Sequence, residues 1–193
     1  MKIEILYPEI CTLYGDKGNT MYLQKCLPGA EFVTTGLNEK PLFLKENIDM
    51  VYMCSMSEKS QELVLDRLMQ YKDEIAACMK DGKALFLLVG NSMELLGDYI
   101  KREDGTRVTG LGVVPGMYSV RQTPNRFNTL IKAKFNDMTL IGYTSRFAHT
   151  YGIPDDMTFC KVEIGQGSNP DTMNEGICKN RVIATYIHGP LLI

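Results

Sequence analysis

The stretch ALFLLVGNSMELLG, residues 84–97, decides the fold class of this chain. Its first six residues are apolar without interruption, as in a strand that is covered on both faces of a sheet. Gly90 and Asn91 then turn the chain, and a short helix is predicted over residues 92–99. Because strand–helix alternation is typical of layered α/β folds, this segment predicts an α/β protein.

The remainder of the chain extends the same pattern. Towards the N-terminus, strands are predicted over residues 1–7, 30–35 and 49–54, with a loop over 11–19 and a helix over 20–27. Ser55 or Ser57 can cap one long helix that ends near Gly82 and buries a stripe formed by Val64, Leu68, Tyr71, Ile75 and Met79. Towards the C-terminus, strands over 129–135, 139–143, 158–164 and 181–187 are accompanied by a polar loop over 165–175. We expect a single domain over residues 1–193, a three-layer α/β sandwich around a mostly parallel sheet.

Composition excludes several classes of function. The formal net charge is −2 and the basic residues are scattered, unlike the basic patch of a nucleic-acid-binding protein. No apolar run reaches the roughly 20 residues of a membrane span. The six cysteines form no C-x-x-C pair and only two histidines are present, so no zinc site is expected. No cofactor is predicted either. Free thiols are typical of a cytoplasmic protein.

Two strand ends are the expected location of any site. Ligands of open α/β sheets gather where the carboxyl ends of strands meet loops. The turn at Gly90 has the form of a nucleophile elbow, which lifts one side chain above the sheet. The segment ATYIHGP, residues 184–190, ends another strand and presents His188 towards the same edge. We therefore expect Gly90 and His188 to lie close together.

Four segments carry a resemblance to a known family: LYGDKGN (13–19), the turn with its ELLG helix (94–97), GLG (110–112) and ATYIHGPLL (184–192). In this order they resemble the CobB/CobQ-like glutamine amidotransferases, and within that family the GatD subunits. The resemblance implies a type 1 glutamine amidotransferase-like fold with a flavodoxin-like half. It implies glutamine or a related small ligand. It also implies a Mur-ligase-like synthetase partner, MurT, with which GatD amidates lipid II in bacterial cell-wall synthesis.

The same resemblance marks a missing nucleophile. His188 matches the family's catalytic histidine, but the catalytic cysteine position falls on Gly90 when the ELLG helix is matched, or on Val89 when the strand is matched. Neither residue can attack an amide. Other family positions differ as well. In the elbow, Asn91-Ser92 stands where the family has paired glycines, and Glu94 stands where it has a glutamine. Elsewhere, Cys54-Ser55-Met56 replaces the glycine-rich oxyanion loop, and Thr144-Ser145-Arg146 replaces a segment with a glutamate and a histidine.

Three further residues match family positions, each with a plainer alternative. Asn125 and Arg126 match a position near the glutamine-access surface, although a solvated loop accounts for them equally well. Asp16 matches the D-x-G-N loop together with Asn19, and either residue can simply form a turn or cap a helix.

Two hypotheses of function follow. The first is a catalytically silent amidotransferase-like protein that binds a ligand or partner, with His188 vestigial. The second is an active subunit that supplies ammonia to a Mur-ligase-like synthetase, or for a cobyric-acid-type substrate, through another nucleophile such as Ser92 or Cys54. Glu94 is predicted to lie in the first turn of the helix over residues 92–99, where the helix dipole favours its ionised form and the carboxylate stabilises the helix.

Overall fold

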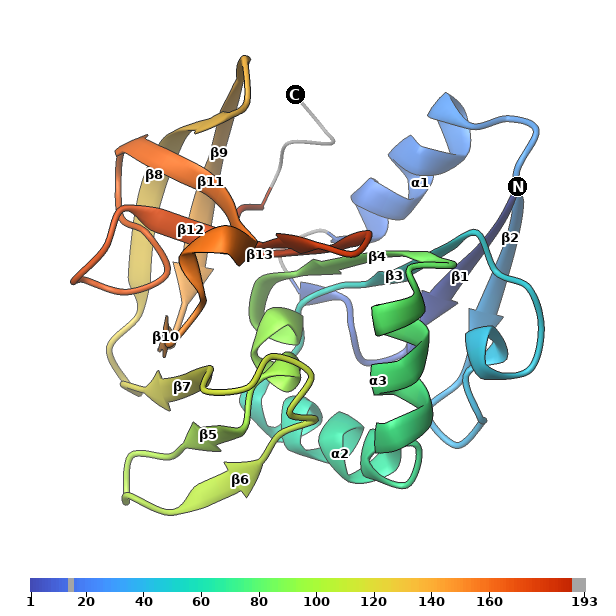
Figure 1. Cartoon of the computed structure of the whole chain (residues 1–193), viewed down its shortest axis with the longest axis horizontal. Coiled ribbons are helices and arrows are strands. Elements are labelled where there is room, and N and C mark those ends of the chain that lie inside the picture. The colour runs from blue at the N-terminus through green and yellow to red at the C-terminus, as the bar shows by residue number, and fades with distance from the viewer. Residues whose placement is uncertain (14–15, 189–193) are drawn as a thin grey trace.

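The computed structural model describes residues 1–13 and 16–188, with only the backbone of Asp16. A nine-stranded sheet in the order β2-β1-β3-β4-β13-β12-β11-β8-β9 forms its centre. Five strands at one end are parallel neighbours: β1 (Lys2–Leu6), β2 (Glu31–Thr35), β3 (Met50–Met53), β4 (Leu85–Val89) and β13 (Val182–Thr185). Helix α1 (Asp16–Cys26) lies on one face of this half, and α2 (Glu58–Met69) and α3 (Lys72–Asp81) lie on the other (Figure 1). The α/β class and the three layers are confirmed.

The parallel arrangement ends at β13. The sheet continues antiparallel through β12 (Asn174–Lys179), β11 (Thr158–Ile164), β8 (Phe127–Phe135) and β9 (Met138–Arg146). Parallel neighbours need a crossover of a dozen residues or more, whereas β8 and β9 are joined by a two-residue turn at Asn136 and Asp137. A second, four-stranded sheet adds β10 (Ala148–Tyr151), β7 (Tyr118–Arg121), β5 (Tyr99–Lys101) and β6 (Arg107–Thr109). The sheet is therefore parallel over its first half only.

Several predicted boundaries are wrong. The single long helix is two helices, because the chain breaks at Gln70 and Tyr71; the predicted stripe is shared between them. Ser57, not Ser55, caps α2, since its side chain accepts the Ser60 N–H. The short helix after β4 is a 3₁₀ helix, η3 (Gly90–Leu96), followed by β5. Gly82 ends α3 in the left-handed conformation, as predicted.

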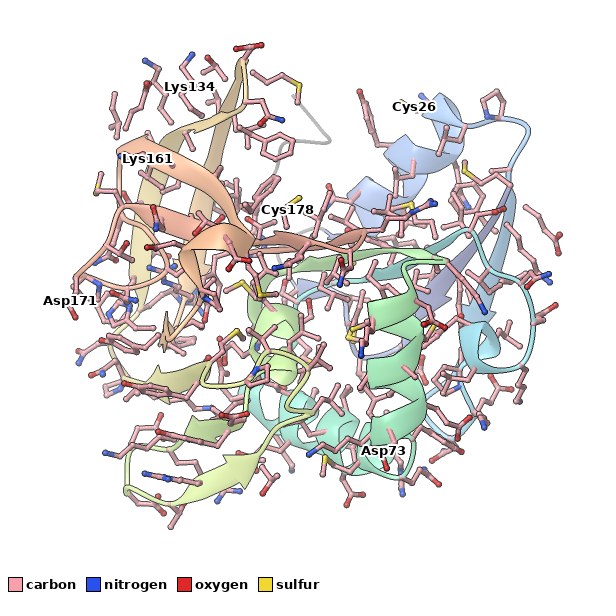
Figure 2. All side chains as sticks on the ribbon, viewed as in Figure 1. Cys26, Asp73, Lys134, Lys161, Asp171 and Cys178 are labelled. Atoms are coloured by element: carbon pink, nitrogen blue, oxygen red, sulfur yellow. The ribbon has the colours of Figure 1, made fainter. Side chains whose placement is uncertain are left out.

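Among the described residues, two further short 3₁₀ turns are η2 (Leu42–Leu44) and η4 (Asp155–Met157). All six cysteines are free, and Figure 2 shows Cys26 at the end of α1 and Cys178 on β12, on separate parts of the molecule. Within the described residues, no helix has the length and apolar character needed to cross a bilayer.

Candidate functional site

The turn after β4 has the backbone of an elbow. Val89 is extended, with φ −114° and ψ 140°, and Gly90 has φ +68°. An L-residue at this φ is strained by roughly 1–2 kcal/mol, which glycine avoids. From the sequence, the nucleophile position could fall on either Val89 or Gly90. In the structure Val89 still has the conformation of a strand, and the chain turns at Gly90.

His188 lies at this turn. Two residues connect it to the end of β13, which pairs with β4 in a register that places Thr185 beside Val89. Its backbone exchanges hydrogen bonds with Tyr143 of β9, at 2.7 Å from the His188 N–H and 3.2 Å to the His188 carbonyl. A Cβ atom built on Gly90 would lie 2.9 Å from His188 Cε1. The structure thus brings together the two positions that the sequence predicted to meet.

Burial governs the chemistry of this histidine. The side chain is 1% exposed, and desolvation lowers the pKa of His188 to about 4. The imidazole is consequently neutral at pH 7 and able to accept a proton. Nothing at residue 90 can donate one, because glycine has no side chain.

The alternative nucleophiles are differently placed. Ser92 is fully buried, and its hydroxyl donates to the Val89 carbonyl at 2.8 Å and is 3.3 Å from the Met53 carbonyl. Cys54 is 4% exposed. The three heavy atoms nearest to a Cβ at Gly90 belong to Ser55 and His188, and none belongs to either alternative.

The matched binding positions lie on the surface or outside the described residues. Asn125 and Arg126 are exposed in the segment between β7 and β8, where the Asn125 N–H closes a turn on the Gln122 carbonyl at 2.8 Å. The Arg126 guanidinium lies 4.6 Å from the centre of the Phe147 ring, a cation–π contact. The side chain of Asp16 is not among the described residues. Asn19 is buried in α1 and lines a small apolar cavity of about 90 Å³.

Glu94 is the centre of a polar network that the sequence did not reveal. Its two oxygens accept hydrogen bonds from Gln61 Nε2 and the Tyr186 hydroxyl, both at 2.9 Å. Gln61 in turn accepts from Arg121 at 2.9 Å, and the Tyr186 hydroxyl lies 2.6 Å from Thr150 Oγ1. Burial raises the pKa of Glu94 to about 7, opposite to the stabilised ionised form that was expected for the first turn of a helix. The available signal was Gln61, a polar residue three positions before Val64 on the buried face of its helix.

Arg146 has a structural role. It is 3% exposed, donates to the Gly167 carbonyl at 2.5 Å and lies 4.5 Å from the centre of the Tyr186 ring. These contacts hold the end of β9 against the loop before β12.

A family model describes the chain almost from end to end. Residues 2–192 match the CobB/CobQ-like glutamine amidotransferase domain. The chain belongs to this family. Two relatives are named as the GatD subunit of lipid II isoglutaminyl synthase (glutamine-hydrolyzing). The one from Streptococcus pneumoniae (strain ATCC BAA-255 / R6) is 28% identical over 196 residues, covering 100% of this chain and 75% of the relative. The one from Staphylococcus aureus (strain N315) is 25% identical over 182 residues, covering 93% and 73%.

Solved structures of low identity support the fold. A chain of PurLQS from Thermotoga maritima superposes with a TM-score of 0.67 at 12% identity, covering 97% of this chain and 86% of that one. A glutamine amidotransferase from the same organism gives a TM-score of 0.58 at 14% identity, with 97% and 75% covered. Both show the same fold class for this amidotransferase-like chain.

Proposed function

We propose that this amidotransferase-like chain is a single domain without glutaminase activity, which binds a small ligand or a synthetase partner. One observation carries the proposal: the elbow residue that faces the neutral imidazole of His188 is Gly90. Amide hydrolysis of this kind needs a nucleophile activated by a neighbouring base. A base without a nucleophile has no proton to accept, so His188 is vestigial in this proposal.

The binding role follows from what remains. A scaffold can bind a partner without any catalytic group, because function resides in particular sites on a fold. Two relatives are named as subunits of a synthase, which supports a Mur-ligase-like synthetase as the partner and a cell-wall precursor as the context. On the family resemblance, Arg126 and Asn125 are assigned to the surface from which glutamine or a related ligand would approach, and Asp16 is assigned to ligand binding through the D-x-G-N loop. Free thiols support a cytoplasmic location.

The competing function is an active subunit that supplies ammonia through another nucleophile. The geometry favours it less, since the Ser92 hydroxyl is bonded to backbone carbonyls inside the protein. Cys54 is not favoured either, because the three heavy atoms nearest to a Cβ at residue 90 belong to Ser55 and His188 and none belongs to Cys54.

Ammonia release from glutamine distinguishes the two functions. The chain is assayed alone and with a Mur-ligase-like synthetase, with the Streptococcus pneumoniae GatD subunit as the active reference. We expect no release above that of a His188→Ala variant. Release that depends on His188 would overturn the proposal, and failure to co-purify with the co-expressed synthetase would overturn its partner clause.

A further inference from the structure

The segment after β3 closes over the elbow. Ser55 follows β3 by two residues, and its side chain covers Gly90. A Cβ at Gly90 would lie 2.5 Å from Ser55 Cβ and 3.2 Å from Ser55 Oγ. Carbon atoms at optimal contact are about 3.5–4.0 Å apart, so the space for any side chain at residue 90 is already filled.

Asn91 holds the same segment by a pair of hydrogen bonds. Its Oδ1 accepts the Met56 N–H at 2.9 Å, and its Nδ2 donates to the Met56 carbonyl at 2.7 Å. Gln61 Nε2 adds a bond to the Asn91 carbonyl at 2.7 Å. The side-chain amide of Asn91 therefore pairs with Met56 much as a neighbouring strand would.

The pairing with Asn91 occupies the backbone N–H of Met56, which is then no longer available to a ligand in the elbow. An elbow stabilises a developing oxyanion with the N–H that follows the nucleophile and with a second N–H from a facing loop. The Met56 N–H comes from the loop that faces the elbow, and it points at the residue directly after Gly90. With Asn91 Oδ1 as its acceptor, this N–H has no remaining hydrogen for an oxyanion.

We propose that Ser55 and Asn91 form an internal lock on the elbow. Ser55 fills the volume of a side chain at residue 90, and Asn91 takes the facing backbone donor. A thiol restored at residue 90 alone is then both crowded and without an oxyanion site, and a ligand of this domain binds without entering the elbow. The inference rests on the proposed function, because it assigns a second barrier to the same missing reaction.

Site-resolved alkylation of an introduced thiol tests the lock. The variants are Gly90→Cys alone, Gly90→Cys/Ser55→Gly, and the triple variant that adds Asn91→Gly. In the reaction with iodoacetamide, the thiolate sulfur bonds to the methylene carbon, iodide leaves, and the thiol proton passes to a base. Peptide mass spectrometry reports the modified position separately from the six native cysteines.

The expected result is a difference between the variants. At pH 6–7 the thiol of the triple variant should react at least about tenfold faster than that of Gly90→Cys, since removal of Ser55 and Asn91 opens the space around the sulfur to the reagent. Gly116→Cys is the matched control, because Gly116 has φ +83° and no heavy atom within 4 Å of its Cβ position. Rates within twofold of each other for the single and triple variants would overturn the lock.

A second measurement avoids the substituted elbow. In Asn91→Ala, with Gly90 retained, the Met56 amide should exchange its hydrogen at least about tenfold faster than in the unmodified protein, because its side-chain acceptor is gone. Unchanged exchange would contradict the role of Asn91. Neither readout depends on ammonia release, so a failed lock and a failed proposed function give different results.

Discussion

Replacing Gly90 with alanine adds one methyl group at the most constrained point of the site. Two costs are expected. The backbone at φ +68° penalises an L-residue by roughly 1–2 kcal/mol. The new Cβ would also lie 2.5 Å from Ser55 Cβ and 2.9 Å from His188 Cε1, and overpacking of this kind costs about 1–3 kcal/mol. Urea denaturation should therefore show Gly90→Ala destabilised by roughly 2–5 kcal/mol, read from the midpoint with the m-value unchanged.

Gly105→Ala separates the backbone cost from the crowding. Gly105 has φ +86° and no heavy atom within 4 Å of its Cβ position, so its substitution should cost only the backbone part, about 1–2 kcal/mol. In a double-mutant cycle, Ser55→Gly with Gly90→Ala should show a coupling free energy of about 1–3 kcal/mol in favour of the pair. Equal losses for Gly90→Ala and Gly105→Ala, together with zero coupling to Ser55, would refute the steric argument.

Three further outcomes are expected from the same denaturation measurements. Burial raises the pKa of Glu94 to about 7, so the folded state holds a proton that the unfolded state releases above its usual pKa of 4.5. The stability that this group contributes is lost as the pH rises from about 4.5 through about 7. Between pH 4 and pH 8, the free energy of unfolding of Glu94→Gln should therefore rise by roughly 3 kcal/mol relative to that of the unmodified protein. A difference in unfolding free energy that stays constant with pH would contradict the burial of this carboxyl. The pKa of His188 is lowered from 6.5 to about 4, so the unfolded state takes up the proton first and stability is lost as pH falls. As the pH falls from 7 to 5, the free energy of unfolding of His188→Gln should therefore decrease by about 2 kcal/mol less than that of the unmodified protein. If both free energies of unfolding changed in parallel with pH, the imidazole would not be desolvated. Arg121 pairs with Glu62 at 2.7 Å with its side chain 5% exposed, whereas the Arg102 side chain on the same carboxylate is 37% exposed. Arg121→Ala should cost about 1–3 kcal/mol, because it leaves the buried Gln61 oxygen without its donor, whereas Glu62 keeps Arg102. Arg102→Ala should cost less than about 1 kcal/mol, and similar losses would show that burial does not set the strength of these pairs.

That Gly90 and His188 lie at the same edge of the sheet could be predicted from the fold class. Both residues follow strands of the parallel half, and the carboxyl ends of parallel strands share one edge. The continuous apolar run before Gly90 and the strand before His188 were sufficient to place them there. Their strands are direct neighbours in the sheet, which brings the positions within contact distance.

The contacts of Ser55 and Asn91 could not be predicted in this way. They depend on the register between β3 and β4, in which Met53 lies beside Leu88. Sequence fixes register when polar and apolar residues alternate, because a shift by one residue then exposes the core face. The strand sequences MVYM and LFLLV are apolar at every position, so no such alternation marks their alignment.

The environment of Glu94 could not be predicted from the sequence for a different reason. Its place in the first turn of the helix predicted over residues 92–99 suggested an ionised carboxylate, because helix starts favour negative charge. In the structure η3 begins at Gly90, so Glu94 lies beyond the first turn. The determining contacts come from Gln61 on α2 and Tyr186 after β13, which are 33 and 92 residues away in the chain. Partners at such separations leave no periodic signal around the residue itself, and burial among them sets the pKa of Glu94.

The packing around the elbow bears on whether the site has simply decayed. A glycine at a buried turn would leave a void if the neighbouring segment kept its distance, and voids of even a few methyl groups cost about 1 kcal/mol or more. Instead Ser55 covers Gly90, and both polar groups of the Met56 backbone bond to Asn91. The edge that would hold a reactive thiol is thus filled, hydrogen-bonded and compatible with a stable sheet. This packing supports the proposed binding role, because the segment that covers Gly90 is held by contacts that need no catalytic side chain at residue 90.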